Sequence, residues 1–151
     1  SKFHILTQPE SKGMVRELIN IIEAGEKGDV AQLKKGLNDR DPSVRYWAAT
    51  WLGVLKNTDA SKALIKTTGD AVPAVRVADS LALARLGQPE KGTAIILEII
   101  EDENWLAGLY AIRALEWSEV RTPAAKAAVK KARDNPYEFT RRIAKRLSTQ
   151  F

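Results

Sequence analysis

Hydrophobic positions along the chain recur with the spacing of α-helices. In segments such as ILEII at 96–100, apolar residues lie three and four positions apart, which places them on one face of a helix. The strict apolar–polar alternation of a half-buried strand appears nowhere in the sequence. The pattern predicts an all-α protein.

The predicted helices fall into successive pairs. The first members of the pairs are expected at about 29–38, 59–69, 89–101 and 122–133. The second members are expected at about 42–56, 73–86, 104–117 and 136–149. A further helix at about 12–26 precedes the first pair. We therefore divide the chain into an N-terminal tail, 1–11, and a single repeat domain, 12–151.

Three columns of residues share one period along the chain. Aspartates recur at spacings of 31, 32 and 32 residues, at Asp39, Asp70, Asp102 and Asp134. An apolar column precedes them, at Leu33, Leu64, Ile96 and Ala128. Another follows them, at Leu52, Leu83, Leu115 and Leu147. A shared period of this length indicates a solenoid of stacked helical repeats.

Acidic and basic residues recur around the turns inside each pair. A carboxylate in such a turn can accept unpaired N–H groups and complement the dipole of the next helix. We expect a structural role in turns and caps for Asp39, Asp41, Arg45, Asp70, Arg76, Asp102 and Asp134. Their recurrence argues against catalysis, since an active site needs its acid once.

Two of these turns resemble the HEAT-repeat family, in which a turn aspartate is followed by a Val-Arg pair in the second helix. DPSVR at 41–45 and VPAVR at 72–76 match that pattern. The third and fourth periods depart from it, with Ala107-Gly108 and Phe139-Thr140 at the Val-Arg positions. The resemblance covers about 29–149. It implies a right-handed α-solenoid of about four helix pairs plus a leading helix.

A narrower resemblance links two segments to the helical C-terminal domain of some bacterial sulfatases. These are DPSVRYWAATWLG at 41–53 and NPYEFTRRIAKRL at 135–147. The resemblance implies an accessory domain of a larger hydrolase, periplasmic or exported, docked on its own catalytic domain. The sulfatase pattern Cys/Ser-x-Pro-x-Arg is absent here, so we expect no catalysis from this chain alone.

Composition limits the chemistry further. The sequence has no cysteine and one histidine, His4, so neither a cysteine nucleophile nor a multi-histidine metal site can be built. We expect no cofactor and no metal. No run approaches the ~20 apolar residues of a membrane span, and SKFHILTQPESKG at the start does not resemble a signal peptide. The chain opens on Ser1 rather than Met, which suggests a processed product or a piece of a longer protein.

Aromatic residues suggest a surface for a protein partner. Trp47, Trp51 and Val54 lie on one helical stripe, and the repeat register aligns this stripe with residues of the later second helices. The candidate partner-binding face comprises Trp47, Trp51, Tyr110, Trp117, Arg142 and Arg146. The alternative is that the tryptophans fill gaps between neighbouring repeats. The pattern leaves both open.

Positive charge is confined to the C-terminal end. Residues 1–120 carry a net charge of −2 and residues 121–151 a net charge of +7. This basic cluster could hold anionic groups, or it could be the solvated cap of the last repeat: Lys126, Lys130, Lys131, Arg133, Arg141, Arg142, Lys145 and Arg146.

Two other functions remain open beside the accessory domain. One is a free-standing protein-binding adaptor. The other is a nucleic-acid binder similar to the HEAT-like alkylpurine DNA glycosylases, which combine basic and aromatic residues on a concave face. Those enzymes are longer, and the confinement of charge to the last pair disfavours this hypothesis.

Overall fold

The computed structural model describes residues 9–101, 104–117 and 120–151. Within these ranges the regular structure is entirely helical and contains no strand, which confirms the all-α prediction. The α-helices are α2 (Pro9–Lys27), α3 (Val30–Gly36), α4 (Pro42–Val54), α5 (Ser61–Thr67), α6 (Pro73–Arg85), α7 (Pro89–Ile100), α8 (Trp105–Trp117), α9 (Pro123–Ala132) and α10 (Glu138–Leu147). Two 3₁₀ turns, η1 (Thr58–Ala60) and η2 (Ser148–Gln150), precede α5 and follow α10.

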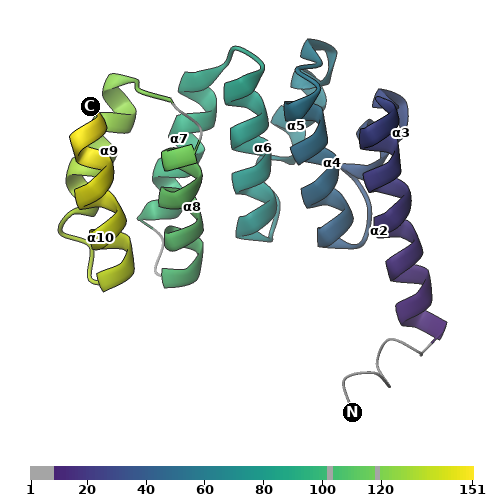
Figure 1. Ribbon diagram of the computed structural model, residues 1–151, viewed down its shortest axis with the longest axis horizontal. Helices are drawn as coiled ribbons and strands as arrows, with labels where there is room; N and C mark the ends of the chain where they lie inside the picture. Colours follow the sequence, from purple (N-terminus) through teal and green to yellow (C-terminus); the bar gives the residue numbers. More distant parts are fainter. Residues whose placement is uncertain (1–8, 102–103, 118–119) are drawn as a thin grey trace.

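The helices form a two-layered α-solenoid (Figure 1). One layer contains α2, α4, α6, α8 and α10, each packed against the next. The other layer contains α3, α5, α7 and α9, each packed against its partner in the first layer. The predicted four pairs and leading helix are confirmed, with α2 beginning at Pro9 rather than near residue 12.

The apolar columns of the repeat lie in the core. Leu52, Leu83, Leu115 and Leu147 are fully buried, as are Leu33 and Leu64. The core has two clusters, one running from α2 to α6 and the other from α6 to α10. Helix α6 serves both, since Leu83 belongs to the first cluster and Val77 to the second. Burial of these columns supplies the main force that stacks the repeats.

Small residues set the spacing of the central helices. A Cβ atom on Gly53 of α4 would meet the backbone of Ala82 in α6. A Cβ atom on Gly92 of α7 would overlap the carbonyl oxygen of Ser80, also in α6. Glycine is needed at both sites because the helix backbones approach too closely for a side chain.

Candidate partner-binding groove

A groove of about 820 Å³ runs over the second helices of the last three pairs. Helix α4 borders it through Tyr46, and α6 contributes Ala74, Val77 and Leu81. Helix α8 contributes Leu106, Leu109, Tyr110, Arg113 and Ala114. Helix α10 contributes Phe139, Arg142, Ile143 and Arg146. The groove thus combines a mainly apolar lining with three arginines.

Several large side chains in the groove are exposed to solvent. The exposed fraction is 60% for Phe139, 55% for Tyr110 and 43% for Leu106. Single exposed apolar residues are common on protein surfaces, but a contiguous group in a concave site marks a place where another molecule binds.

Two of the three groove arginines, Arg146 and Arg113, contact the carboxylate of Glu116 on α8. Arg146 donates to both carboxylate oxygens of Glu116, at 2.8 and 3.0 Å, and Arg113 lies 3.8 Å from the same group. The hydrogen bond from Arg146 lowers the pKa of Glu116, so this carboxylate is charged at neutral pH. Arg142 is exposed and forms no hydrogen bond or ion pair with the described part of the chain.

The structure separates the residues of the predicted partner-binding face. Tyr110, Arg142 and Arg146 lie together in the groove. Trp51 is only partly exposed and packs against Gly25 of α2, where a Cβ atom would overlap its ring. Trp47 does not line the groove, and the side chain of Trp117 lies outside the described residues.

The tryptophans therefore differ in environment. Trp51 fills the space between α4 and the leading helix, because α2 stands where a preceding repeat would stand. Trp47 is 37% exposed and meets the ring of Tyr46 edge-on, with the ring centres 5.6 Å apart.

Replacing Trp51 with alanine is expected to lower the free energy of unfolding by ~2–3 kcal/mol, somewhat less than for a fully buried tryptophan. The loss reflects a cavity between α2 and α4. The matched Trp47→Ala change is expected to cost only about 1 kcal/mol, the scale of one aromatic contact. Urea unfolding followed by circular dichroism measures both, and a larger loss for Trp47→Ala would contradict this assignment.

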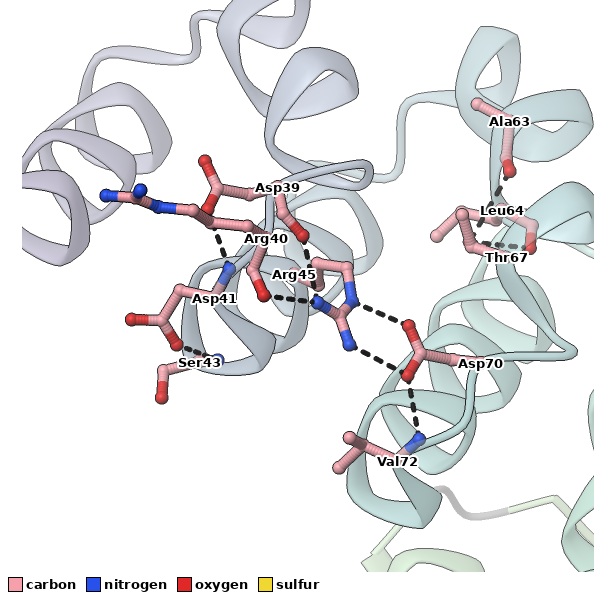
Figure 2. A network of polar contacts seen from close by, with 10 residues as sticks. All are labelled: Asp39, Arg40, Asp41, Ser43, Arg45, Ala63, Leu64, Thr67, Asp70 and Val72. Carbon is pink, nitrogen blue, oxygen red and sulfur yellow. Dashed lines mark hydrogen bonds and ion pairs between the residues drawn. The ribbon is translucent and has the colours of Figure 1, made fainter. Parts of the chain in front are cut away.

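The turn between α3 and α4 is held by two aspartates (Figure 2). Asp39 Oδ1 accepts a hydrogen bond from the N–H of Asp41 at 2.9 Å. Asp41, the N-cap of α4, accepts one from the N–H of Ser43 at 2.8 Å. These bonds satisfy N–H groups that the start of a helix leaves unpaired.

Arg45 links this turn to the next one (Figure 2). Its Nε and Nη2 donate to the two carboxylate oxygens of Asp70, at 2.6 and 3.0 Å. Its Nη1 donates to the carbonyl oxygens of Asp39 and Arg40, at 2.9 and 3.1 Å. Asp70 also accepts from the N–H of Val72 at 2.8 Å. One guanidinium thus fixes two adjacent repeats in register.

The pKa shifts of Arg45 and Asp70 are those of a structural ion pair. Burial alone would raise the pKa of Asp70, but hydrogen bonds from Arg45 and Val72, with the charges of Arg45 and Arg76, hold it below its ordinary value. The hydrogen bond to Asp70 raises the pKa of Arg45 despite burial, which opposes this rise. Both groups are ionised at neutral pH, and neither is available as an acid or base.

The fourth turn repeats this arrangement one residue later than the sequence analysis placed it. Asn135 Oδ1 accepts from the N–H of Tyr137 at 3.0 Å, and Arg141 donates to the carbonyl oxygens of Asn135 and Pro136, at 2.7 and 2.8 Å. Arg141 follows Asn135 by six residues, as Arg45 follows Asp39.

The register assigned to α10 was therefore wrong by one residue. Asn135, and not Asp134, occupies the position of the turn aspartate, while Asp134 lies exposed beside it. Arg141, and not Thr140, occupies the arginine position. Asp102, the turn residue predicted for the third period, lies outside the described residues.

Correcting the register identifies the groove residues that the sequence analysis missed. Tyr46 aligns with Val77, Leu109 and Arg142, and each of these four residues lines the groove. On α4, the helical stripe that faces the groove contains Tyr46, and it is therefore displaced by one position from the stripe that contains Trp47 and Trp51. The signal was present in the spacing from Asn135 to Arg141.

Members of the basic cluster lie in different environments. Arg142 and Arg146 lie in the groove, whereas Arg141 binds turn carbonyls. Lys131 pairs instead with Glu101, at 2.6 Å. The described residues therefore present two α10 arginines to the groove rather than a broad cationic face.

One buried acid was not anticipated. Asp79 of α6 is fully buried, and neither of its carboxylate oxygens has a hydrogen-bond partner. It occupies a column otherwise formed by buried alanines, Ala48, Ala111 and Ala144. Burial raises the pKa of Asp79 to about 7. No groove residue is among its electrostatic partners, so we assign this group to stability rather than to the site.

The described ranges, with their gaps at 102–103 and 118–119, contain neither a cluster of metal-ligating residues nor a helix that could span a membrane. No group of three or more His, Cys, Asp or Glu residues there is arranged to hold a metal ion. None of the helices in those ranges is both long and apolar enough to cross a membrane.

Comparison with protein families identifies part of the chain. Residues 30–96 match a family model described as HEAT repeats, and this segment runs from α3 into α7. The match supports the HEAT-type resemblance over this segment. Comparison with curated proteins gives no match.

Proposed function

We propose that this chain is a non-catalytic docking module, with 12–151 as its single domain, that holds a protein segment in the groove between α6, α8 and α10. The main support for this proposal is the group of exposed apolar side chains in that groove, Leu106, Tyr110 and Phe139. Ordered side chains of this size stay exposed at a cost in free energy that binding a partner would recover.

We further propose that the partner is the catalytic domain of a sulfatase-like parent chain. The support is the sequence resemblance of 41–53 and 135–147. On this proposal the protein is periplasmic or exported. The alternative occupant is a separate polypeptide held by a free-standing adaptor.

A nucleic acid is the less favoured occupant. Nucleic-acid affinity comes mainly from cations that track successive phosphates. Here Arg142 and Arg146 lie at one end of an apolar groove, and Lys131 is paired elsewhere with Glu101.

Photo-crosslinking in the native cell tests the docking proposal. A benzophenone amino acid is placed at Tyr110 or at Phe139, whose side chains are already exposed. The matched control position is Ile65 of α5, in the opposite layer and 37% exposed. We expect a discrete adduct from the groove positions and none from Ile65.

The identity of the adduct separates the occupants. A peptide encoded upstream in the same gene supports the accessory-domain proposal, and a different polypeptide supports the adaptor. Nucleic acid in the adduct contradicts protein docking. Absence of any adduct from both groove positions, or equal adducts from Ile65, overturns the groove as the functional site.

A further inference from the structure

We infer that the groove takes an acidic amphipathic segment, whose apolar side chains fill its floor and whose carboxylates meet Arg142 and Arg146. This inference rests on the proposed function and adds to it the chemistry of the partner. It follows from the arrangement of apolar and charged side chains within the groove.

The floor of the groove suits a row of apolar side chains. Val77 and Leu81 of α6, Leu109 of α8 and Ile143 of α10 line it on three adjacent helices. Val77 and Leu81 lie four residues apart, so they form a continuous ridge along α6. A segment with apolar residues on one face can cover such ridges, which is the usual way that an amphipathic helix binds a groove.

The charge of the groove is of one sign. Its three charged lining residues are Arg113, Arg142 and Arg146, and no carboxylate from the described ranges lines it. Glu116, whose side chain is 11% exposed, neutralises part of this charge while holding Arg146 in place. Arg142 has no such partner among the described residues and is therefore the guanidinium free to bind a carboxylate.

The placement of the arginines also fixes the orientation of the partner. Arg142 and Arg146 lie four residues apart on α10, so both point from one face of that helix. At the opposite border of the groove, α4 contributes an aromatic side chain, Tyr46, and no arginine or lysine. The acidic end of a bound segment therefore belongs over α10 and its apolar end toward α6.

Two synthetic peptides test this inference on the full chain. Both are 16 residues long, carry leucines at helical spacing and have a fluorescein label; one has glutamate at the remaining positions and the other has lysine. Fluorescence anisotropy measures their dissociation constants. We expect the glutamate peptide to bind at least about tenfold more tightly, with the preference shrinking as added salt screens the charges.

Variants locate the binding on the protein. Arg142→Glu is expected to remove most of the preference for the glutamate peptide, while Arg142→Gln removes part of it. Phe139→Ala is expected to weaken both peptides by a similar factor. Lys130→Glu, which changes an exposed charge on α9 outside the groove, is the matched control and is expected to leave the preference unchanged.

The outcomes distinguish failure of this inference from failure of groove docking. Equal binding of both peptides, sensitive to Phe139→Ala, overturns the acidic partner and leaves groove docking intact. A preference for glutamate that ignores Arg142→Glu but responds to Lys130→Glu overturns both. If neither peptide binds at millimolar concentration, the inference falls, and the photo-crosslink alone decides on the groove.

Discussion

Replacing Asp79 with alanine is expected to stabilise the protein, with a gain that grows as the pH rises from acidic to slightly basic. Asp79 is fully buried on α6, and its carboxylate oxygens have no hydrogen-bond partner. Even a neutral polar group in this position costs about 1–3 kcal/mol of desolvation. Alanine removes that cost, and the neighbouring repeats carry alanine at the equivalent positions, so the cavity left behind is small.

The pH dependence follows from ionisation of the same group. Burial, together with the charge of Asp70, raises the pKa of Asp79 to about 7. The Thr67 hydroxyl and the charge of Arg45 oppose the rise, but the one proton of that hydroxyl is directed toward the carbonyl oxygens of Leu64 and Ala63, at 3.0 and 3.4 Å.

The sign of the effect is set by which state holds the proton. An unfolded aspartate titrates near pH 4, so between about pH 4 and 7 the folded protein keeps a proton that the unfolded chain has lost. The free energy of unfolding therefore falls as the pH rises through this window. A rise of about three pKa units corresponds to a loss on the order of 4 kcal/mol, which Asp79→Ala should abolish.

Asp79→Asn provides the control for charge. Asparagine has nearly the same shape and keeps the buried polar group, but it cannot ionise. It should therefore flatten the pH dependence as alanine does, with a smaller gain at acidic pH. Urea unfolding at intervals between pH 4 and 8 measures all three proteins. A variant with the pH slope of the wild type, or a less stable Asp79→Ala protein at pH 8, would contradict the assignment.

The helix pairs and their core were predictable because their signals repeat. Leu52, Leu83 and Leu115 recur in register and are fully buried, and Leu147 of α10, one position out of that register, is fully buried as well. Burial of an apolar column is imposed by the stacking of every repeat on its neighbour, so periodicity alone finds it. Asp79 was missed for the same reason, since a single polar residue in a column of alanines has no periodic signature.

The groove was harder to predict because a helix turns by about 100° per residue. A one-residue error in the repeat register therefore assigns to the groove a side chain that lies beside it. Asp134 and Asn135 are adjacent, and either can close the turn before α10, so the period of the aspartates alone did not decide between them. Trp51 was ambiguous for a different reason, since only the structure shows that α2 covers it.

Replacing Arg45 with methionine is expected to lower the free energy of unfolding by about 2–4 kcal/mol, between the costs of losing an exposed and a fully buried ion pair. The exposed fractions of the Arg45 and Asp70 side chains are 16% and 9%. Methionine keeps the packing of the arginine stem but leaves the Asp70 carboxylate largely buried without its main donor. The carbonyl oxygens of Asp39 and Arg40 lose a donor as well.

Arg45→Met should also change how the free energy of unfolding depends on pH in the acidic range. The lowered pKa of Asp70 stabilises the wild type above about pH 4, and this contribution is lost as the pH falls through the folded-state pKa. Without Arg45 the pKa of Asp70 should rise, because burial raises it and only the Val72 hydrogen bond and the charge of Arg76 still oppose burial. The stability difference between wild type and variant should therefore be largest above about pH 4 and shrink as the pH falls, and an NMR titration of the Asp70 carboxyl would show the raised pKa directly.

Two comparisons show whether the cost arises from the uncompensated carboxylate. Lys131→Met removes an ion pair with Glu101 whose side chains are 68% and 51% exposed, so it leaves no buried carboxylate unpaired and the free energy of unfolding should hardly change. The double variant Arg45→Met/Asp70→Asn should recover part of the loss, because it removes the charge that Arg45→Met leaves unpaired. If the two substitutions are instead additive, the link between the first two repeats depends on the turn carbonyls that Arg45 binds rather than on its ion pair with Asp70.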